Sequence, residues 1–370
     1  MAMSTPLHQL GDHGQSVWID FLSRELLRGG ELARMMREDA VSGVTSNPTI
    51  FQKAIAAGDA YDEQLRGRIE TENDPKESFI QLASKDVRDA CDLLRSVWDE
   101  RCRGCDGYVS IEVDPNLAHD TDASIAEAQR LHELIDRPNL YVKIPATKAG
   151  LPAIEEMIAR GKSTNVTLIF SLQRYAEVAE AYVRGLERLV EAGGDAGGVA
   201  SVASFFVSRV DTEADRRLDE LGGHEDLKGK LAIANAKLAY QRYKEIFAGE
   251  RWEALAAKGA WRQRCLWAST STKNPAYSDV MYVEEPIGAE TVNTMPAETI
   301  RAFQDHGTVA PTLESGLDEA KRVLEQLAQV GVDYDDVTAT LEKEGIQKFT
   351  DSFEELLNAI EAKRRELIPA

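Results

Sequence analysis

The chain has 370 residues, a length that allows two average domains or one α/β barrel of ~250 residues with an appendage. Its 43 Lys and Arg residues stand against 63 Asp and Glu residues, and the formal net charge is −20. This charge argues against a protein that binds nucleic acid or an anionic membrane surface. An anionic substrate would therefore have to be bound by a few local positive groups.

The N-terminal segment and the cysteines favour a cytoplasmic protein. Residues 1–14 have neither a basic start nor an apolar run, so no secretory signal is expected, and no stretch approaches the ~18 apolar residues of a membrane span. Four cysteines are few for this length, as in a reducing compartment. Cys102 and Cys105 have CxxC spacing, but no second pair and no suitably spaced histidine accompany them, so a redox or metal role is not favoured.

Short strand-like runs alternate with amphipathic stretches along the chain. The predicted strands are 16–21, 43–47, 108–114, 140–146, 165–171, 199–207, 264–269 and 291–295. Helical spacing predicts helices at 86–99, 124–135, 151–159, 172–192 and 228–247. Eight such units over ~290 residues predict a (β/α)8 TIM barrel, with a doubly wound open sheet as the main alternative. We expect the catalytic barrel domain to cover residues 1–310.

The last sixty residues have a different pattern, because they contain helical spacing and no strand signal. Helices are predicted at 318–329, 338–344 and 349–368. We expect residues 311–370 to form a C-terminal helical extension that packs on the barrel, without a catalytic cluster of its own.

Lys143 lies in a short apolar run, 140–146, where burial would favour a neutral amine that can attack a carbonyl. A lysine at a strand end that reaches water is the alternative interpretation. Alternation within four predicted strands gives several polar residues the same inward phase as Lys143. These residues are Asp20, Glu112, Asn165 and Thr167, and the other strands add Asn47, Ser204, Phe206 and Ser269. A buried ion-pair network that only fixes the fold is the competing explanation.

The sequence offers no sign of a bound cofactor. Neither a GxGxxG nor a GxxxxGK[ST] motif is present, and the six histidines fall outside the predicted strands. We therefore expect neither a cofactor nor a metal.

Several motifs, in chain order, resemble those of the transaldolases. They are Thr45-Ser46-Asn47-Pro48-Thr49-Ile50-Phe51, Ser110-Ile111-Glu112-Val113-Asp114-Pro115, Val142-Lys143-Ile144-Pro145-Ala146-Thr147, Asn165-Val166-Thr167-Leu168-Ile169-Phe170-Ser171 and Ser204-Phe205-Phe206-Val207-Ser208-Arg209. The tract 267–275 is similar to that of the longer bacterial transaldolases. The resemblance covers roughly residues 16–300.

This resemblance implies a metal-free class I enzyme of the non-oxidative pentose phosphate pathway. A dihydroxyacetone unit would pass from sedoheptulose 7-phosphate or fructose 6-phosphate to glyceraldehyde 3-phosphate or erythrose 4-phosphate. The implied roles are an imine on Lys143, acid–base work by Asp20, and a proton-shuttling water held by Glu112 and Thr167. Asn47, Asn165 and Ser204 would bind the dihydroxyacetone hydroxyls, and Arg209 and Ser269 would bind the phosphate.

The sequence departs from the family pattern in the phosphate loop. Many transaldolases have an arginine two residues after the loop serine, whereas here Thr270-Ser271-Thr272 leads into Lys273. Lys273 would replace that arginine only with a two-residue shift, and it would offer a point charge without the planar fork.

Two other functions remain open at this stage. A fructose-6-phosphate aldolase would use the same lysine and release free dihydroxyacetone. By family analogy, a tyrosine at position 206 would favour release, whereas Phe206 favours transfer. A non-catalytic sugar-phosphate-binding protein would not require a buried amine such as Lys143. The expected partners are small sugar phosphates, with no nucleic acid or membrane, and a homo-oligomer is possible.

Overall fold

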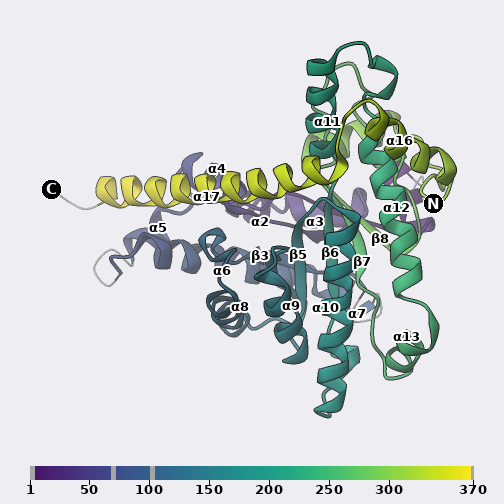
Figure 1. Cartoon of the computed structure of the whole chain (residues 1–370). Helices are drawn as coiled ribbons and strands as arrows, with labels where there is room; N and C mark the ends of the chain where they lie inside the picture. Colours follow the sequence, from purple (N-terminus) through teal and green to yellow (C-terminus); the bar gives the residue numbers. More distant parts are fainter. Residues whose placement is uncertain (1–4, 68–71, 101–104, 368–370) are drawn as a thin grey trace.

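The computed structural model describes residues 5–67, 72–100 and 105–367 (Figure 1). In this part of the chain, parallel strands β1 to β8 close into one barrel in chain order. They are β1 (Gln15–Ile19), β2 (Val41–Val44), β3 (Val109–Glu112), β4 (Leu140–Pro145), β5 (Thr164–Ile169), β6 (Ser201–Phe206), β7 (Arg264–Ala268) and β8 (Thr291–Met295). The predicted TIM barrel is therefore confirmed, and the doubly wound sheet is excluded.

The strand prediction is least accurate at β2, which ends at Val44 and not at Asn47. Asn47 is instead the N-cap of α4 (Pro48–Ala56), and its side-chain oxygen accepts a hydrogen bond from the Ile50 amide at 3.0 Å. Pro48 explains the difference, because its fixed φ and missing N–H suit the first position of a helix. The strand motif therefore bends into a helix at the residue that carries the polar side chain.

Helices surround the barrel and connect successive strands. Those that precede residue 150 are α1 (Pro6–Asp12), α2 (Arg24–Arg28), α3 (Glu31–Glu38), α5 (Asp62–Arg66), α6 (Pro75–Leu93), α7 (Arg95–Glu100) and α8 (Thr121–Ile135). Later ones are α9 (Gly150–Ala159), α10 (Leu172–Glu191), α11 (Ser208–Leu221), α12 (Leu231–Ile246), α13 (Gly249–Ala256), α14 (Met281–Glu284) and α15 (Ala297–His306). The predicted helix 86–99 was placed too late, since it falls on the end of α6 and on α7.

The C-terminal segment forms α16 (Leu317–Gln329) and the 34-residue helix α17 (Tyr334–Leu367), which runs across one end of the barrel in yellow in Figure 1. The prediction of two separate helices at 338–344 and 349–368 is wrong, because α17 continues through both ranges as one helix that ends at Leu367. Ile368 lies outside the described residues. Gly345 continues the helix although glycine costs ~1 kcal/mol relative to alanine there. A Cβ on Gly345 would lie 3.0 Å from Leu168 Cδ2, so glycine permits α17 to approach β5 closely.

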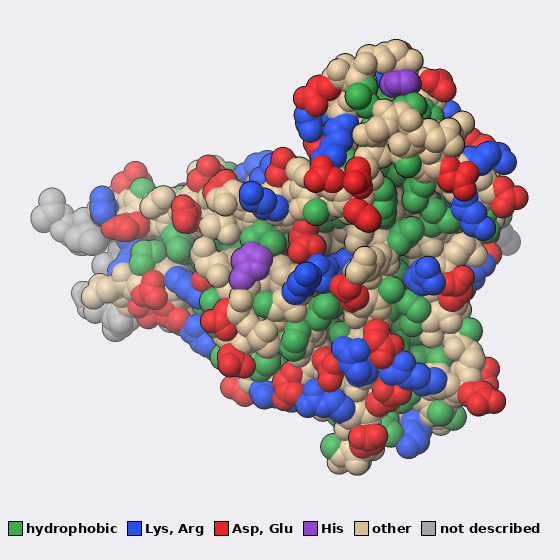
Figure 2. Space-filling model, in the orientation of Figure 1, with side chains coloured by type: hydrophobic (Ala, Val, Ile, Leu, Met, Phe, Trp, Pro, Cys, Tyr) green, Lys and Arg blue, Asp and Glu red, His purple; other side chains and the backbone are tan. Residues whose placement is uncertain are grey.

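The surface carries interspersed acidic and basic side chains, as the face in Figure 2 shows. None of the described helices is long and apolar enough to cross a membrane. Cys91 and Cys265 are buried free thiols. Cys105 is disulfide-bonded, and Cys102, the other cysteine of the CxxC pair, lies outside the described residues.

Candidate active site

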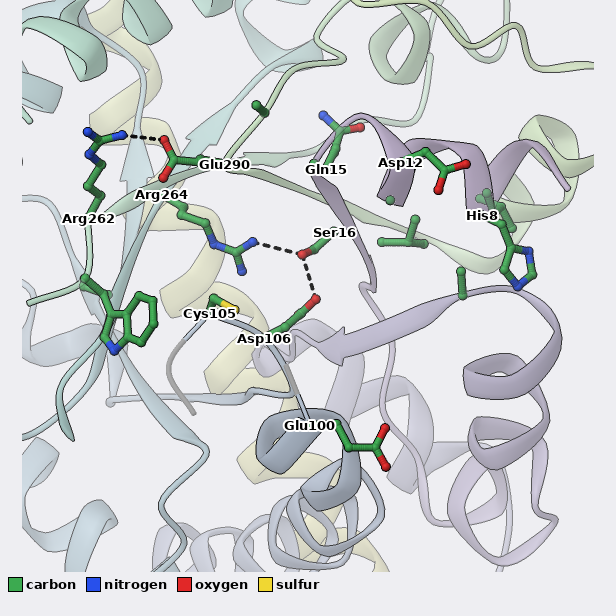
Figure 3. Close-up of a pocket in the computed structure, with 18 of the residues that line it drawn as sticks. His8, Asp12, Gln15, Ser16, Glu100, Cys105, Asp106, Arg262, Arg264 and Glu290 are labelled. Atoms are coloured by element: carbon green, nitrogen blue, oxygen red, sulfur yellow. Dashed lines mark hydrogen bonds and ion pairs between the residues drawn. The ribbon is translucent and has the colours of Figure 1, made fainter. Parts of the chain in front are cut away.

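Two cavities open at opposite ends of the barrel. The larger, about 1080 Å³, lies at the amino-terminal ends of β1, β6 and β7 (Figure 3). None of the candidate site residues predicted from the sequence lies in its wall. The smaller, about 270 Å³, lies at the carboxyl-terminal ends of the strands. We call these the lower cavity and the upper cavity. Nine of the predicted site residues line the upper cavity: Asp20, Asn47, Lys143, Thr167, Ser204, Phe206, Arg209, Ser269 and Lys273.

Lys143 is buried on β4, with 5% of its surface exposed, so the interpretation as a strand-end lysine that reaches water is wrong. Its Nζ donates to Glu112 Oε2 at 3.0 Å and to the Ser46 carbonyl at 3.2 Å. The register places Glu112 of β3 directly beside Lys143. Burial raises the pKa of Glu112, although the adjacent Lys143 opposes this. The Glu112 carboxylate is therefore positioned to take a proton from the Lys143 ammonium.

Asp20 follows β1 and is held by its neighbours at the barrel mouth. Its backbone N–H donates to the Met295 carbonyl at 2.8 Å, and its Oδ1 accepts from the Thr45 hydroxyl at 2.7 Å. The Thr45 hydroxyl also contacts that of Thr294 at 2.7 Å. Burial raises the pKa of Asp20, while Lys143 and Arg209 lower it. The raised pKa suits a group that must both accept and return a proton.

The two buried carboxyls do not differ in the direction of their pKa shifts. Burial raises the pKa of both Asp20 and Glu112, so the direction of the shift does not identify which carboxyl is the acid and which is the base. What distinguishes them is the partner, since Glu112 contacts an ammonium and Asp20 contacts a hydroxyl.

Ser204 lines the upper cavity and forms a polar chain with Asn165. Ser204 Oγ donates to Asn165 Oδ1 at 2.6 Å, and Asn165 Nδ2 donates to Ser110 Oγ at 3.1 Å. These bonds fix the amide orientation of Asn165, which is fully buried and supports Ser204 from below. Thr167 Oγ1 and Glu112 Oε1 are buried and have no hydrogen-bond partner among the described residues.

Arg209, at the start of α11, supplies positive charge to the upper cavity. Its guanidinium carbon lies 4.8 Å from the centre of the Phe206 ring. Its Nη1 is buried and has no hydrogen-bond partner in the described part of the chain. Burial lowers the pKa of this guanidinium, and the nearby Asp20 and Glu112 oppose that shift. The stacked ring orients the fork and leaves donors for an anion.

The acidic residues that follow Arg209 on α11 have other partners. Asp211 accepts from the Tyr282 hydroxyl at 2.8 Å and from the Ala232 amide at 2.7 Å. Glu213 pairs with Arg216 and Arg217, each at 2.8 Å. Neither carboxylate neutralises Arg209, so the positive charge of this residue remains available to the cavity.

The loop after β7 adds hydroxyls and one exposed ammonium. Ser269 has φ 56°, a left-handed conformation uncommon for a serine, and its Oγ lies 3.0 Å from Ser208 Oγ. Lys273 lines the cavity, but its Nζ is exposed and donates to Ser271 Oγ at 2.6 Å. Ser269 is therefore fixed by the fold, whereas Lys273 sits on the rim.

Several site residues were missed by the sequence analysis. Thr45, Thr294 and Glu298 line the upper cavity, and Phe349 of α17 forms part of its wall. No site residue had been expected after residue 310, because a phenylalanine in an amphipathic helix has the same pattern as any core residue. Within the described residues, no group of three or more His, Cys, Asp or Glu side chains is placed to hold a metal ion.

Comparisons with known proteins find a matching family and several relatives that cover nearly the whole chain. A family model described as transaldolase/fructose-6-phosphate aldolase matches residues 17–360. A protein named transaldolase from Frankia alni is 55% identical over 361 residues, which cover 97% of each chain. A transaldolase from Acidothermus cellulolyticus is 53% identical over 98% of this chain and 99% of its own. Transaldolase 2 of Streptomyces coelicolor is 50% identical over the full length of both chains.

Proposed function

The chain belongs to the transaldolase/fructose-6-phosphate aldolase family, and from this premise we propose that it is a transaldolase that moves a dihydroxyacetone unit between sugar phosphates. The single observation that carries the proposal is the buried Lys143–Glu112 pair at 3.0 Å, open on one side to a cavity that also contains Asp20 and Arg209. A buried amine beside a carboxylate of raised pKa is suited to imine formation.

The first step joins the ketose donor to Lys143. Transfer of a proton from the ammonium to Glu112 gives a neutral amine, which attacks the ketose carbonyl carbon. The resulting carbinolamine must lose water to form the imine. Glu112 Oε1 and Thr167 Oγ1 are buried acceptor groups with no partner among the described residues, so we assign them to the water that carries these protons.

The second step cleaves the carbon–carbon bond. Asp20 takes the proton of the hydroxyl beside that bond, the aldose phosphate leaves, and the bonding electrons pass into the iminium to give an enamine. Addition to an acceptor aldehyde runs the same step in reverse, and Asp20 returns the proton. We assign Ser204 and Asn47, which line the cavity, to the hydroxyls of the dihydroxyacetone unit, with Asn165 beneath Ser204.

The phosphate would bind at the α11 side of the upper cavity. Arg209 offers donors from a guanidinium without an acidic partner in the described residues. Ser269, in the loop after β7, lines the same cavity, and its Oγ lies 3.0 Å from Ser208 Oγ at the start of α11. Lys273 would contribute from the rim. Local positive charge of this kind is required because a chain of net charge −20 repels a phosphate at long range.

Transfer and aldol release can be separated in one assay. The enzyme is given fructose 6-phosphate with and without erythrose 4-phosphate, and both sedoheptulose 7-phosphate and free dihydroxyacetone are measured. A transaldolase forms the heptulose phosphate and releases little dihydroxyacetone, whereas fast release without acceptor would identify an aldolase. Absence of both products would favour a binding protein.

Three further expectations belong to this proposal. We propose a cytoplasmic location, supported by the low cysteine count and by the buried free thiols of Cys91 and Cys265, whereas the disulfide at Cys105 is unusual for a reducing compartment. We also propose the division into a barrel domain at 1–310 and a helical extension at 311–370. A homo-oligomer is a prediction that light scattering would test.

A further inference from the structure

Helix α17 places Phe349 at the reacting centre. The Phe349 ring centre lies 5.7 Å from Lys143 Nζ and 5.9 Å from the guanidinium carbon of Arg209. Phe349 lines the upper cavity and is itself only 5% exposed. An apolar ring thus lines the upper cavity beside both the amine and the arginine.

The position of this ring is fixed from both sides. One turn before it, Gly345 brings the helix close to Leu168 and Phe170 of the β5 region. One turn after it, the Phe353 ring packs edge-on against Phe79 of α6, with centroids 5.8 Å apart. A ring held at both neighbouring turns can act as a rigid wall.

Polar contacts also tie the helix to the barrel. Thr49 of α4 donates to Ser352 Oγ at 2.8 Å, and Arg217 of α11 pairs with Asp336 at 2.6 Å. Arg174 of α10 lies 3.4 Å from Glu342. Because these contacts come from three separate barrel helices, α17 is anchored along its length above the strand ends. Figure 1 shows this course across the barrel.

The reaction proposed above creates a need for such a wall. After the aldose leaves, the enamine on Lys143 can add to an acceptor aldehyde or be lost to water. In the second route the enamine carbon takes a proton, the iminium adds one water, and dihydroxyacetone departs as the Lys143 amine is restored. Only the entry of water and a proton is required, so an apolar surface beside Nζ opposes this loss.

We propose that Phe349 is a specificity-determining residue that favours transfer over release by keeping water away from the enamine on Lys143. This inference rests on the proposed function, since it assumes that Lys143 carries the intermediate. It gives α17 a role in the reaction in addition to its packing role, and it extends the site beyond the barrel strands.

The test compares Phe349→Leu and Phe349→Ala with the unaltered protein, using fructose 6-phosphate and erythrose 4-phosphate. The ratio of free dihydroxyacetone to transferred product should rise about tenfold or more in Phe349→Ala, the change produced by ~1.4 kcal/mol between two competing barriers. Phe349→Leu keeps an apolar side chain, so it should give a smaller rise and a stable fold. Leu357→Ala, a partly buried change on the same helix outside the cavity wall, is the matched control.

The outcomes separate this inference from the function on which it rests. Equal losses of transfer and release in both Phe349 variants, with an unchanged ratio, would overturn the role of Phe349. A similar rise in Leu357→Ala would assign the effect to helix packing and would overturn it as well. Borohydride trapping on the unaltered protein is run alongside, and a failure to trap an adduct there would instead contradict the proposed function.

Discussion

The two ends of the barrel differ in how their charges are used. In the lower cavity, Arg262 pairs with Glu290 at 2.7 Å (Figure 3). Arg264 donates a hydrogen bond to Ser16 Oγ at 2.9 Å, and this hydroxyl donates to Asp106 at 2.7 Å. The upper cavity has about a quarter of that volume, yet Arg209 has no acidic partner there among the described residues. Arg264 Nη2 at the lower end is also buried without a hydrogen-bond partner among the described residues. The two ends are therefore distinguished by the buried Lys143–Glu112 pair beside the upper cavity, and not by the size of the cavity.

This difference follows from what each end must do. A site for a sugar phosphate needs donors that are oriented before binding, as Arg209 is by the Phe206 ring. Carboxyl ends of barrel strands are also where active sites lie in this fold. The comparison predicts that changes in the upper cavity impair turnover and that matched changes in the lower cavity do not.

Lys143→Ala should have the largest effect. Loss of the amine removes the only group to which we assign the covalent step, so turnover of fructose 6-phosphate should fall to background. The fold should survive, because the raised pKa of Glu112 favours a neutral acid once its partner is removed. Circular dichroism and thermal melting check the fold, and Lys148→Ala, a change at an exposed lysine, should keep full activity.

Asp20→Ala should lower the rate by roughly 10²–10⁴, the usual span for a positioned proton-transfer group. The imine should still form, so borohydride should still trap the donor. If trapping is also lost, Asp20 acts before the cleavage step. The lower-cavity counterpart is Asp12→Asn, at which we expect the rate to remain unchanged.

The raised pKa of Asp20 also predicts where the rate falls on the acidic side of the pH–rate profile. The carboxylate must be ionised to accept a proton, and burial raises its pKa above the ordinary value of 3.8. Activity should therefore fall as the pH drops through this raised pKa, at a higher pH than an exposed aspartate would give. Rate profiles of the unaltered protein and of Asp20→Glu should differ in that limb, and identical acidic limbs would count against Asp20.

Arg209→Ala should act mainly on substrate binding. Hydrogen bonds to a charged group are worth ~1.5–3 kcal/mol, so KM for phosphorylated donors should rise roughly 10- to 150-fold. Unphosphorylated sugars and dihydroxyacetone should be affected far less. Equal losses on both substrate classes would mean that Arg209 is structural. Arg262→Ala at the lower end should leave both KM values unaltered.

Asp211→Asn should have the smallest effect on activity and should instead change the pH dependence of stability. Burial raises the pKa of Asp211 from 3.8 to about 7. The stabilisation that its protonated form provides is complete below about pH 4 and is lost as the pH rises through about 7. Asparagine does not ionise, so the variant should not lose this stabilisation between pH 5 and pH 8. The free energy of unfolding of the variant, relative to that of the unaltered protein, should therefore rise between these pH values by on the order of a few kcal/mol. Urea unfolding at both pH values measures this, and no pH-dependent difference would contradict the shift.

Much of the barrel could be predicted from sequence, because strand alternation is a local property. Period-two spacing places Glu112, Lys143 and Thr167 on one interior. The structure agrees with that phase, because Lys143 and Thr167 line the upper cavity and Glu112 contacts Lys143. The limits lie in contacts between distant segments. Phe349 enters the cavity from α17, which approaches β5 closely at Gly345, and no local pattern marks either residue. The Ser46 carbonyl that accepts from Lys143 is likewise a backbone group that a side-chain pattern does not reveal.

The central claim is that Lys143 carries the substrate covalently, and peptide mapping after borohydride reduction tests it most directly. The protein is incubated with fructose 6-phosphate, reduced, digested and examined by mass spectrometry. We predict a dihydroxyacetone-derived adduct on the peptide that contains Lys143, and none in Lys143→Ala. An adduct on Lys148 or Lys162 instead, or no adduct on an active enzyme, would contradict the account.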